Sequence, residues 1–416
     1  MFDLKKLKEE FADCDCGFPH ELTIKDVVIE SGAVSKVGKI LTRNGFGKKI
    51  LLVADENTLK AAAGIEESLK GFDVEKRIYG NLREATLKES DAIAEMMENK
   101  DGVLAVGTGS VHDISRYAAA KTDKPLCLFA TAPSMDGFAS YSAPLTDGNF
   151  KITYPAKSPE VIIADTKILA ASPVVLKSAG FGDMVGKYVG LIDWQVSALL
   201  TGEYYCKKVA ELTRRATDDI MALADRITAK DEESAKAVFE GLLLTGIGMS
   251  FTKTSRPASG TEHILSHFWE CKKLLNGELS DFHGRKVGVA TLLIMDLYGK
   301  LYEMKTVKCD REVNDWEDIL SAYGDLKGEV IKLNTPDTIT DGIDPRDVEK
   351  KWGEIRKIIA GVPTEKEIRA AMIKAGCPTT CEEIGVSKEL KEEGLKYHPY
   401  MRRRLSLRRI SNMIVG

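Results

Sequence analysis

Histidine is scarce in this chain, with only six in 416 residues. A strong charge of either sign is also missing, because 59 basic residues nearly balance 63 acidic ones and leave a net charge of −4. That balance argues against a nucleic-acid-binding protein held mainly by charge. One dense basic run exists, MRRRLSLRR at 401–409, and we interpret it as a helix face or tail that pairs with acidic neighbours.

Long apolar runs are missing too. No window reaches the roughly 18 uninterrupted apolar residues of a membrane-spanning helix. The N-terminal stretch, MFDLKKLKEEFADCDC, is charged throughout and lacks the apolar core of a signal peptide. We therefore expect a cytoplasmic protein.

The cysteine pattern does not indicate a disulfide framework. Eight cysteines are scattered through a long chain, whereas disulfide scaffolds are small and dense in cysteine. Two close pairs, Cys14/Cys16 and Cys377/Cys381, lack the repeated C-x-x-C spacing that is typical of zinc sites. We expect free thiols.

The two halves of the chain differ in their residue patterns. Between about residues 26 and 165, short β-rich runs such as KKILLVAD alternate with helical stretches. This alternation predicts a mostly parallel, doubly wound sheet. After about residue 169 helical periodicity dominates. We therefore predict an α/β dinucleotide-binding domain at 1–168 and an all-helical domain at 169–416.

A glycine turn follows one predicted strand, in the sequence VLAVGTGSVHD at 103–113. Glycines allow a ligand to approach the backbone, and the following helix offers free N–H groups that suit a pyrophosphate. The third glycine of G-x-G-x-x-G is replaced by His112. The same residues would also make a simple tight turn between strand and helix, so this motif alone leaves the choice open.

Two further segments lie at predicted strand ends. Asp55 closes the strand LLVAD, where a carboxylate can accept hydrogen bonds from ribose hydroxyls and repel a 2′-phosphate, favouring NAD over NADP. It could equally cap the next helix. The segment TAPSMDGFAS at 131–140 follows a later strand and should lie at the carboxyl edge of the sheet, where ligands bind.

Three of the six histidines fall in one short window. His263 and His267 lie one helical turn apart, and His283 follows at the start of another helix. The order does not match the H-E-x-x-H of metalloproteases. Asp183, on an apolar helix, is the best carboxylate partner, although an ion pair with Lys187 would also explain its position. A carboxylate with two imidazoles predicts a catalytic metal site with open positions.

The motifs GTGSVHD, TAPSMDGFAS, AGFGDMVGK, SRPASGTEHILSH and HGRKVGVAT occur in this order. Together they resemble the sn-glycerol-1-phosphate dehydrogenase family, and more its bacterial-type branch. That family belongs to the superfamily of iron-type alcohol dehydrogenases, glycerol dehydrogenases and dehydroquinate synthases. The resemblance implies a dehydroquinate synthase-like fold. It covers most of the chain and is weakest in the first twenty residues and at 302–359.

The resemblance implies a role for individual residues. Asp183, His263 and His283 match the metal ligands, while Asp136, Asp183 and His267 match substrate contacts. Asp183 and His267 are the implied catalytic residues. The positions that match dinucleotide contacts are Asp55, Gly109, Ser110, Val111, His112, Asp113, Thr131, Ala132, Pro133, Ser134 and Ser140.

The implied reaction is the reversible reduction of dihydroxyacetone phosphate to sn-glycerol 1-phosphate, in glycerophospholipid-type metabolism. We expect NAD(H) to be preferred, with NADP(H) possible, and one divalent metal, with nickel ahead of zinc and iron(II). His267, or water held by it, would relay the proton. We also expect a homodimer. The sequence does not select among four candidate partners for the substrate phosphate: Lys187, Lys253, Arg256 and Lys286.

Three alternatives stay open from the residues alone. A glycerol or polyol dehydrogenase would have the same metal site without a phosphate requirement. A dehydroquinate synthase would also need NAD and metal, but its pocket should carry more basic residues. A catalytically silent NAD-binding protein would have no reason to retain the metal ligands.

Overall fold

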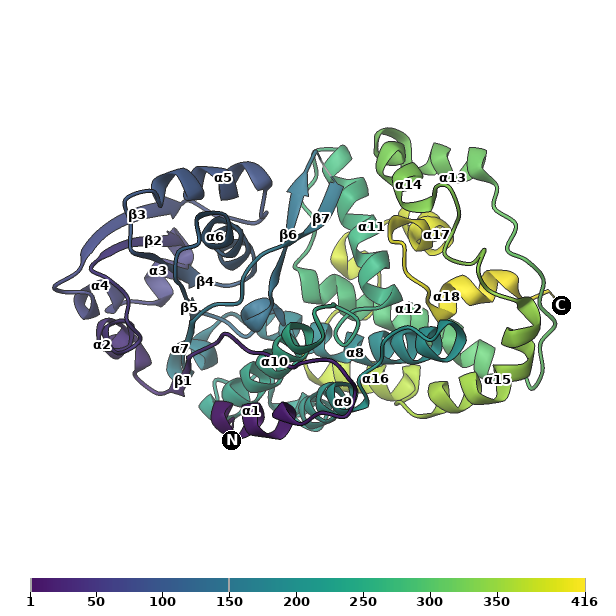
Figure 1. Ribbon diagram of the computed structural model, residues 1–416, viewed down its shortest axis with the longest axis horizontal. Helices are drawn as coiled ribbons and strands as arrows, with labels where there is room; N and C mark the ends of the chain where they lie inside the picture. Colours follow the sequence, from purple (N-terminus) through teal and green to yellow (C-terminus); the bar gives the residue numbers. More distant parts are fainter. Residues whose placement is uncertain (1, 149, 416) are drawn as a thin grey trace.

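The computed structural model describes residues 2–148 and 150–415. An α/β part and a helical part lie side by side (Figure 1). No helix within the described ranges is long and apolar enough to cross a membrane.

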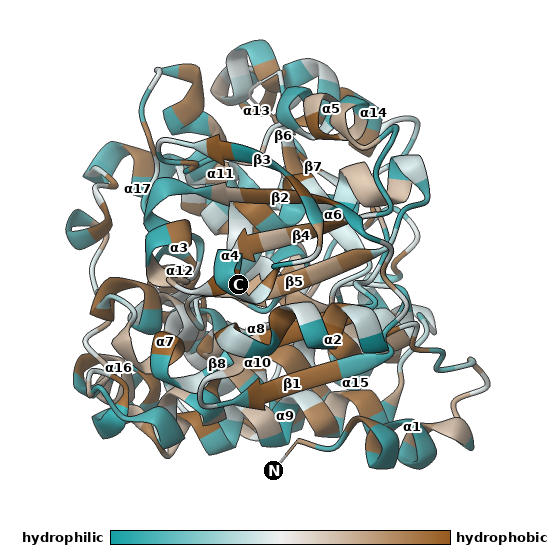
Figure 2. Cartoon of the chain, turned by 90° about the vertical axis from the view of Figure 1, so that its left-hand side faces the viewer, coloured by the Kyte–Doolittle hydropathy of each residue, from teal (hydrophilic) through white to brown (hydrophobic). Residues whose placement is uncertain are grey.

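The α/β part is built on a six-stranded sheet in the order β1-β8-β5-β4-β2-β3, with every pairing parallel. The central strands are buried along their length, as expected of a sheet covered by helices on both faces, and Figure 2 shows them as apolar. The predicted α/β fold is confirmed. The strands are β1 (Asp26–Glu30), β2 (Lys49–Asp55), β3 (Asp73–Tyr79), β4 (Gly102–Gly107), β5 (Leu126–Ala130) and β8 (Val161–Asp165).

The register of this sheet aligns the ends of its central strands. Ala54 of β2 is paired with Val106 of β4, and Gly107 is paired with Ala130 of β5. The residues that follow these strands therefore lie along one carboxyl edge. The helices of this part are α2 (Val37–Arg43), α3 (Glu56–Ala61), α4 (Ile65–Ser68), α5 (Leu87–Met96), α6 (Gly109–Thr122) and α7 (Thr166–Ala171).

A hairpin that the sequence analysis did not predict joins the two parts. Strands β6 (Ser142–Asp147) and β7 (Phe150–Pro155) pair antiparallel. They stand between the sheet and α11 in Figure 1. The hairpin brings Lys151 close to the helical part, where its ammonium contacts Glu270 of α11.

The second half is helical, as predicted. Among the described residues after β8, the only β-type pairing is an isolated antiparallel bridge between Cys309 and Ile414. The helices are α8 (Val174–Thr201), α9 (Lys207–Met221), α10 (Glu232–Thr252), α11 (Thr261–Leu275), α12 (His283–Glu303), α13 (Trp316–Tyr323), α14 (Lys327–Asn334), α15 (Pro345–Ala360), α16 (Glu365–Lys374), α17 (Lys388–Tyr397) and α18 (Leu407–Ile410).

Glycines set the close packing of α8 against α12. A β-carbon at Gly284 would collide with the carbonyl oxygen of Ala179, and one at Gly182 would collide with the carbonyl oxygen of Gly284. Because both positions lack a side chain, the two backbones touch. This contact places Asp183 on α8 next to His283, the first residue of α12.

The proposed domain boundary between residues 168 and 169 falls inside α7. The N-terminal helix α1 (Leu4–Ala12) packs on the helical part, where the ring of Phe11 stacks on that of Phe251. Two arginines of the basic run at 401–409, Arg403 and Arg409, pair with carboxylates as predicted, whereas the other three donate to carbonyl, amide and hydroxyl oxygens. Arg409 contacts Glu312 at 2.5 Å in the interior, so this run is part of the packed helical structure.

Candidate active site

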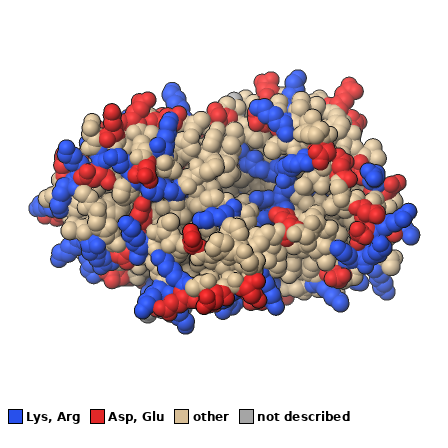
Figure 3. Space-filling view, viewed as in Figure 1, with Lys and Arg blue, Asp and Glu red and all other residues tan. Residues whose placement is uncertain are grey.

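A cavity of about 500 Å³ lies between the two parts and is lined by residues of both. Its size is typical of small-molecule and cofactor sites. In the space-filling view, Lys and Arg side chains gather in the hollow between the parts (Figure 3). Most of the predicted site residues line the cavity: Asp55, Gly109, Ser110, Val111, Asp113, Ser134, Asp136, Ser140, His263, His267 and His283.

Five predicted residues do not line it. Asp183 is fully buried just behind the cavity wall. The His112 side chain is fully buried against Phe138, and burial lowers its pKa to about 3. Thr131, Ala132 and Pro133 are not among the lining residues either. The glycine turn therefore meets the cavity through the start of α6, and the TAPSMDGFAS segment meets it from Ser134 onward.

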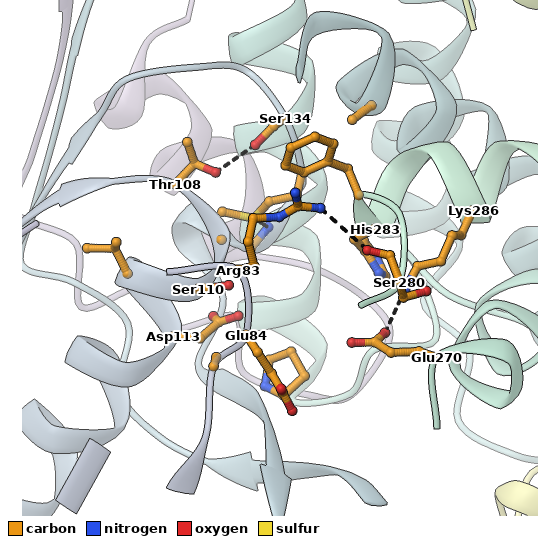
Figure 4. A pocket seen from close by; sticks show the side chains of 18 of the residues that line it. Arg83, Glu84, Thr108, Ser110, Asp113, Ser134, Glu270, Ser280, His283 and Lys286 are labelled. Carbon is orange, nitrogen blue, oxygen red and sulfur yellow. Dashed lines mark hydrogen bonds and ion pairs between the residues drawn. The ribbon is translucent and has the colours of Figure 1, made fainter. Parts of the chain in front are cut away.

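The start of α6 forms one end of the site. α6 begins at Gly109, directly after β4, so its free N–H groups lie at the carboxyl edge of the sheet. The hydroxyls of Thr108 and Ser134 are 2.7 Å apart and tie the two predicted cofactor segments together (Figure 4). This end has the donors and positive helix dipole that suit an anion such as a pyrophosphate.

Two carboxylates at this end hold the local structure. Asp55 caps α3, accepting from the N–H of Thr58 at 2.8 Å, so the capping alternative is realised while Asp55 also lines the cavity. Asp113 pairs with the buried Arg116 at 2.6 Å. Burial raises the pKa of Asp113 to about 6 against the opposing effect of Arg116.

The other end of the site gathers the three predicted metal ligands from three helices. Asp183 of α8, His263 of α11 and His283 of α12 place one ligand atom each within 4.8 Å of one another. His263 Nε2 lies 3.5 Å from Asp183 Oδ1. The imidazole rings of His263 and His283 have centroids 5.1 Å apart.

This donor set fits a divalent metal. Two imidazoles and one carboxylate leave positions open for water or substrate. Glu262 contacts His263 Nδ1 at 2.5 Å, which leaves Nε2 facing Asp183. A carboxylate on the outer nitrogen is the usual partner of a metal-binding histidine. Burial would lower the pKa of His263, but contacts with Asp183 and Glu262 raise it to about 9.

Lys187 forms the ion pair that was the alternative explanation for Asp183. Its ammonium lies 2.7 Å from Asp183 and 2.6 Å from Asp136, and all three side chains are buried. Burial opposes the charge on Lys187, but the two carboxylates raise its pKa. Because Lys187 has Asp136 as a second partner, the ion pair and a metal at Asp183 are compatible.

One charged residue that the sequence analysis missed, Glu270, lies beside the predicted metal ligands. Glu270 of α11 contacts Lys286 at 2.9 Å and Lys151 of the hairpin at 3.2 Å. Figure 4 shows Lys286 and Glu270 next to His283, across the cavity from Ser110. Burial opposes ionisation of Glu270, but the two lysines hold its pKa well below the usual range. Glu270 follows His267 by three residues and so shares its helix face, which was the available signal.

His267 lies close to the two histidines of the ligand cluster formed by Asp183, His263 and His283. It lines the cavity, and its ring centroid is 5.7 Å from that of His283 and 6.3 Å from that of His263. Burial holds its pKa well below the usual range, with Arg402 adding to the effect. The imidazole is therefore uncharged at neutral pH.

Comparison with solved structures shows the fold. An archaeal halo-thermophilic alcohol dehydrogenase from a Red Sea brine pool is similar with a TM-score of 0.64 and 16% identity, covering 95% of this chain and 97% of that one. Glycerol dehydrogenase from Schizosaccharomyces pombe is similar with a TM-score of 0.54 and 18% identity, covering 94% and 96%.

Comparison of sequences shows the family. The profile of the iron-containing alcohol dehydrogenases matches residues 28–173. A glycerol-1-phosphate dehydrogenase of Halalkalibacterium halodurans is 36% identical over 71% of this chain and 76% of its own length. One of Bacillus licheniformis is 31% identical over 98% of this chain and 93% of its own length. The chain therefore belongs to the NAD(P)-dependent glycerol-1-phosphate dehydrogenase family and is an enzyme of that family.

Proposed function

We propose that this enzyme reduces dihydroxyacetone phosphate to sn-glycerol 1-phosphate, reversibly, with NADH preferred over NADPH. One observation carries the proposal. A single cavity joins the start of α6 to the two histidines of the ligand cluster, His263 and His283, and to the lysine pair around Glu270. The start of α6 suits the dinucleotide, the ligand cluster suits a metal that polarises the substrate carbonyl, and the lysine pair suits the substrate phosphate.

The dinucleotide would lie along the carboxyl edge of the sheet. The N–H groups that open α6 would bind the pyrophosphate, with the Ser134 hydroxyl beside Thr108 and Ser140 also lining the cavity. Asp55 would accept from a ribose hydroxyl and repel a 2′-phosphate. When bound, the nicotinamide supplies the hydride.

Asp183, His263 and His283 would hold the divalent metal, with nickel proposed first, zinc second and iron(II) third. When bound, the metal supplies Lewis-acid polarisation of the substrate carbonyl. Asp136 would contact the substrate beside this group, because it lines the cavity and shares Lys187 with Asp183.

The proton would come through His267. An uncharged imidazole can donate its N–H proton to the developing alkoxide and accept another from water at its second nitrogen. The low pKa of His267 supports this relay, because the side chain starts without a charge.

The substrate phosphate would bind Lys286 together with Lys151. Both line the cavity, and with Glu270 they leave one uncompensated positive charge. The other candidates have different surroundings. Lys187 is held by two aspartates, Arg256 is buried against Glu203, and Lys253 does not line the cavity.

The test is NADH oxidation by metal-reconstituted enzyme with dihydroxyacetone phosphate, beside dihydroxyacetone, and NAD reduction with glycerol. We expect rapid turnover with the phosphorylated ketone and, at most, slow turnover with dihydroxyacetone. In Lys286→Met the KM for dihydroxyacetone phosphate should rise at least tenfold, whereas any slow turnover of dihydroxyacetone should not change. Equal turnover of both ketones would replace the proposal with a polyol dehydrogenase. Sedimentation of the same sample tests the proposed homodimer.

A further inference from the structure

A second group of metal-ligand side chains lies outside the cavity. The Sγ atoms of Cys14, Cys16 and Cys206 and a ring nitrogen of His20 all lie within 4.8 Å of one another. None of these four residues lines the cavity. Three belong to the segment between α1 and β1, and the fourth precedes α9.

The distances among these atoms match tetrahedral zinc coordination. With Zn–S bonds near 2.3 Å and Zn–N bonds near 2.0 Å, two sulfur ligands lie about 3.8 Å apart, and sulfur and nitrogen about 3.5 Å apart. Here Cys14 Sγ and Cys206 Sγ are 3.7 Å apart. His20 Nε2 is 3.5 Å from Cys206 Sγ and 3.2 Å from Cys16 Sγ.

The histidine is oriented as a ligand. His20 Nδ1 lies 3.2 Å from the carbonyl oxygen of Phe251, so the N–H of the ring belongs at Nδ1 and the lone pair at Nε2 faces the sulfurs. The rings of Phe11 and Phe251, with centroids 5.6 Å and 5.3 Å from that of His20, fix this orientation.

The sulfurs are placed among hydrogen-bond donors. Cys206 is the N-cap of the 15-residue helix α9 and accepts from the N–H of Val209. The hydroxyl of Tyr204 is 3.3 Å from Cys16 Sγ. These donors orient the two sulfurs, as the hydrogen-bond partners of metal ligands do.

A disulfide explains this group less well. The 3.7 Å between Cys14 and Cys206 far exceeds an S–S bond of about 2.05 Å, and all eight cysteines are free. A bond between these two would also leave Cys16 and His20 without a role.

We propose that Cys14, Cys16, Cys206 and His20 bind one zinc ion in a closed Cys₃His site. Four protein ligands fill the tetrahedral positions, so the site is structural. Binding releases the three thiol protons to solvent and leaves the zinc, three thiolates and neutral imidazole with a net charge of −1.

The zinc would fasten the N-terminal segment to the loops that support α11. α1 lies beside α9 and α10 in Figure 1. Phe251, next to His20, is near the end of α10. On the other side, the loop that ends at Cys206 carries Glu203, which pairs with Arg256 at 2.6 Å. The cluster is therefore linked to the 253–260 connection into α11 at two points. Phe251, just before the connection, packs against His20, and Arg256, within it, pairs with Glu203 of the loop that ends at Cys206.

The first test measures metal content of the full chain, purified under reducing conditions without chelators. The His263→Ala/His283→Ala variant should retain one zinc per chain. Adding Cys14→Ser/Cys16→Ser should remove it, whereas adding Cys309→Ser should not, because Cys309 is a partly buried free cysteine outside the cluster. Equal zinc content in the Cys14→Ser/Cys16→Ser and Cys309→Ser samples would overturn the proposal.

A second measurement does not depend on the folding of a cysteine variant. Cobalt(II) bound to His263→Ala/His283→Ala should give thiolate-to-cobalt charge-transfer absorption and the intense visible bands of tetrahedral geometry. Titration of the zinc-loaded protein with a mercurial should release one zinc per chain. Octahedral cobalt bands, no zinc release, or a Cys14–Cys206 disulfide in the freshly purified protein would each contradict the proposal.

Discussion

At the residue scale, two neighbouring histidines have different expected roles, and substitution can separate them. His283→Ala removes a proposed metal ligand, so we expect loss of the active-site metal and a fall in kcat of about a thousandfold, the effect of losing several kcal/mol of Lewis-acid stabilisation. His267→Ala should keep the metal and lower kcat about a hundredfold, as for a proton-transfer residue. Metal analysis and steady-state kinetics on the same samples would decide. Metal loss in His267→Ala would contradict the assignment.

Asp55 caps α3 and has a proposed role toward the cofactor ribose, and one substitution can separate the two. Serine is as good an N-cap as aspartate, so Asp55→Ser should keep α3 intact while removing the charge that faces a 2′-phosphate. We expect the ratio of kcat/KM for NADPH to that for NADH to rise about tenfold, which corresponds to about 1.4 kcal/mol of repulsion. Asp55→Ala, the comparison variant, should also lose about 1 kcal/mol of stability. An unchanged ratio in Asp55→Ser would mean that the carboxylate does not face the ribose.

His398, far from the site in the sequence, should make the protein sensitive to acid. Its ring is fully buried, with Nδ1 2.7 Å from the carbonyl oxygen of Gly394, and burial lowers its pKa from 6.5 to about 3. Below pH 6.5 the unfolded chain therefore binds a proton that the folded chain does not, so stability falls as pH falls.

This single group should contribute about 1.4 kcal/mol per pH unit between pH 6 and pH 4. His398→Asn keeps a donor for Gly394 and removes the titration. Its free energy of unfolding, measured with urea, should fall less steeply over this range than that of the wild type. Parallel curves would contradict the prediction.

At the element scale, the crossing of α8 and α12 sets the relative positions of two proposed metal ligands, Asp183 and His283. Gly284→Ala would drive a methyl group into the Ala179 carbonyl, and we expect a loss of about 1–3 kcal/mol in stability together with weaker metal binding. Gly299→Ala lies on the same helix with nothing within 4 Å of the added carbon. It should be neutral or stabilise by up to about 1 kcal/mol. Equal unfolding and metal titration curves for the two variants would argue against the crossing as the cause.

The sequence predicted the strands and helices whose residue pattern lies within one short segment. Buried β-rich runs such as the one that became β4 end in a glycine turn, and their alternation with helices indicated a parallel sheet. The β6–β7 hairpin was missed, although the sequence DGN at 147–149 between alternating apolar residues is a hairpin signal. The proline in β6, Pro144, weakened that signal.

Contacts between distant segments could not be predicted in the same way. Lys151 meets Glu270 only because the hairpin is placed against α11, and Cys206 meets Cys14 across 192 residues. Because the partners lie far apart in the sequence, neither pairing produces a local residue pattern that sequence analysis can detect. His263 and His267 could be placed together from the sequence, because residues four apart on one helix lie on the same face.

At the scale of the whole molecule, the proposed cofactor and metal positions belong to different parts of the fold. The start of α6 is in the α/β part, whereas Asp183, His263 and His283 come from the helical part. Thr108 and Ser134 hold the start of α6 within the α/β part. The ligand cluster has a contact with that part, because Asp183 accepts a hydrogen bond from the N–H of Asp136 at 2.9 Å, but its three ligand atoms all come from helices of the other part. We therefore expect the two binding events to be separable in the free enzyme.

Two variants test that separation in opposite directions. His263→Ala/His283→Ala should lose the active-site metal, keep the zinc proposed at the cysteine cluster, and still bind NADH within about twofold of the wild type, because independent sites affect each other by no more than about 0.5 kcal/mol. Gly109→Asp adds a carboxylate where the pyrophosphate would lie, with nothing within 4 Å to obstruct it. It should weaken NADH binding at least tenfold and leave metal content unchanged. NADH fluorescence and metal analysis give both readings. If metal loss weakened NADH binding as much as Gly109→Asp does, the ligand cluster would have to shape the cofactor site across the cavity, and the two parts would act as one binding unit.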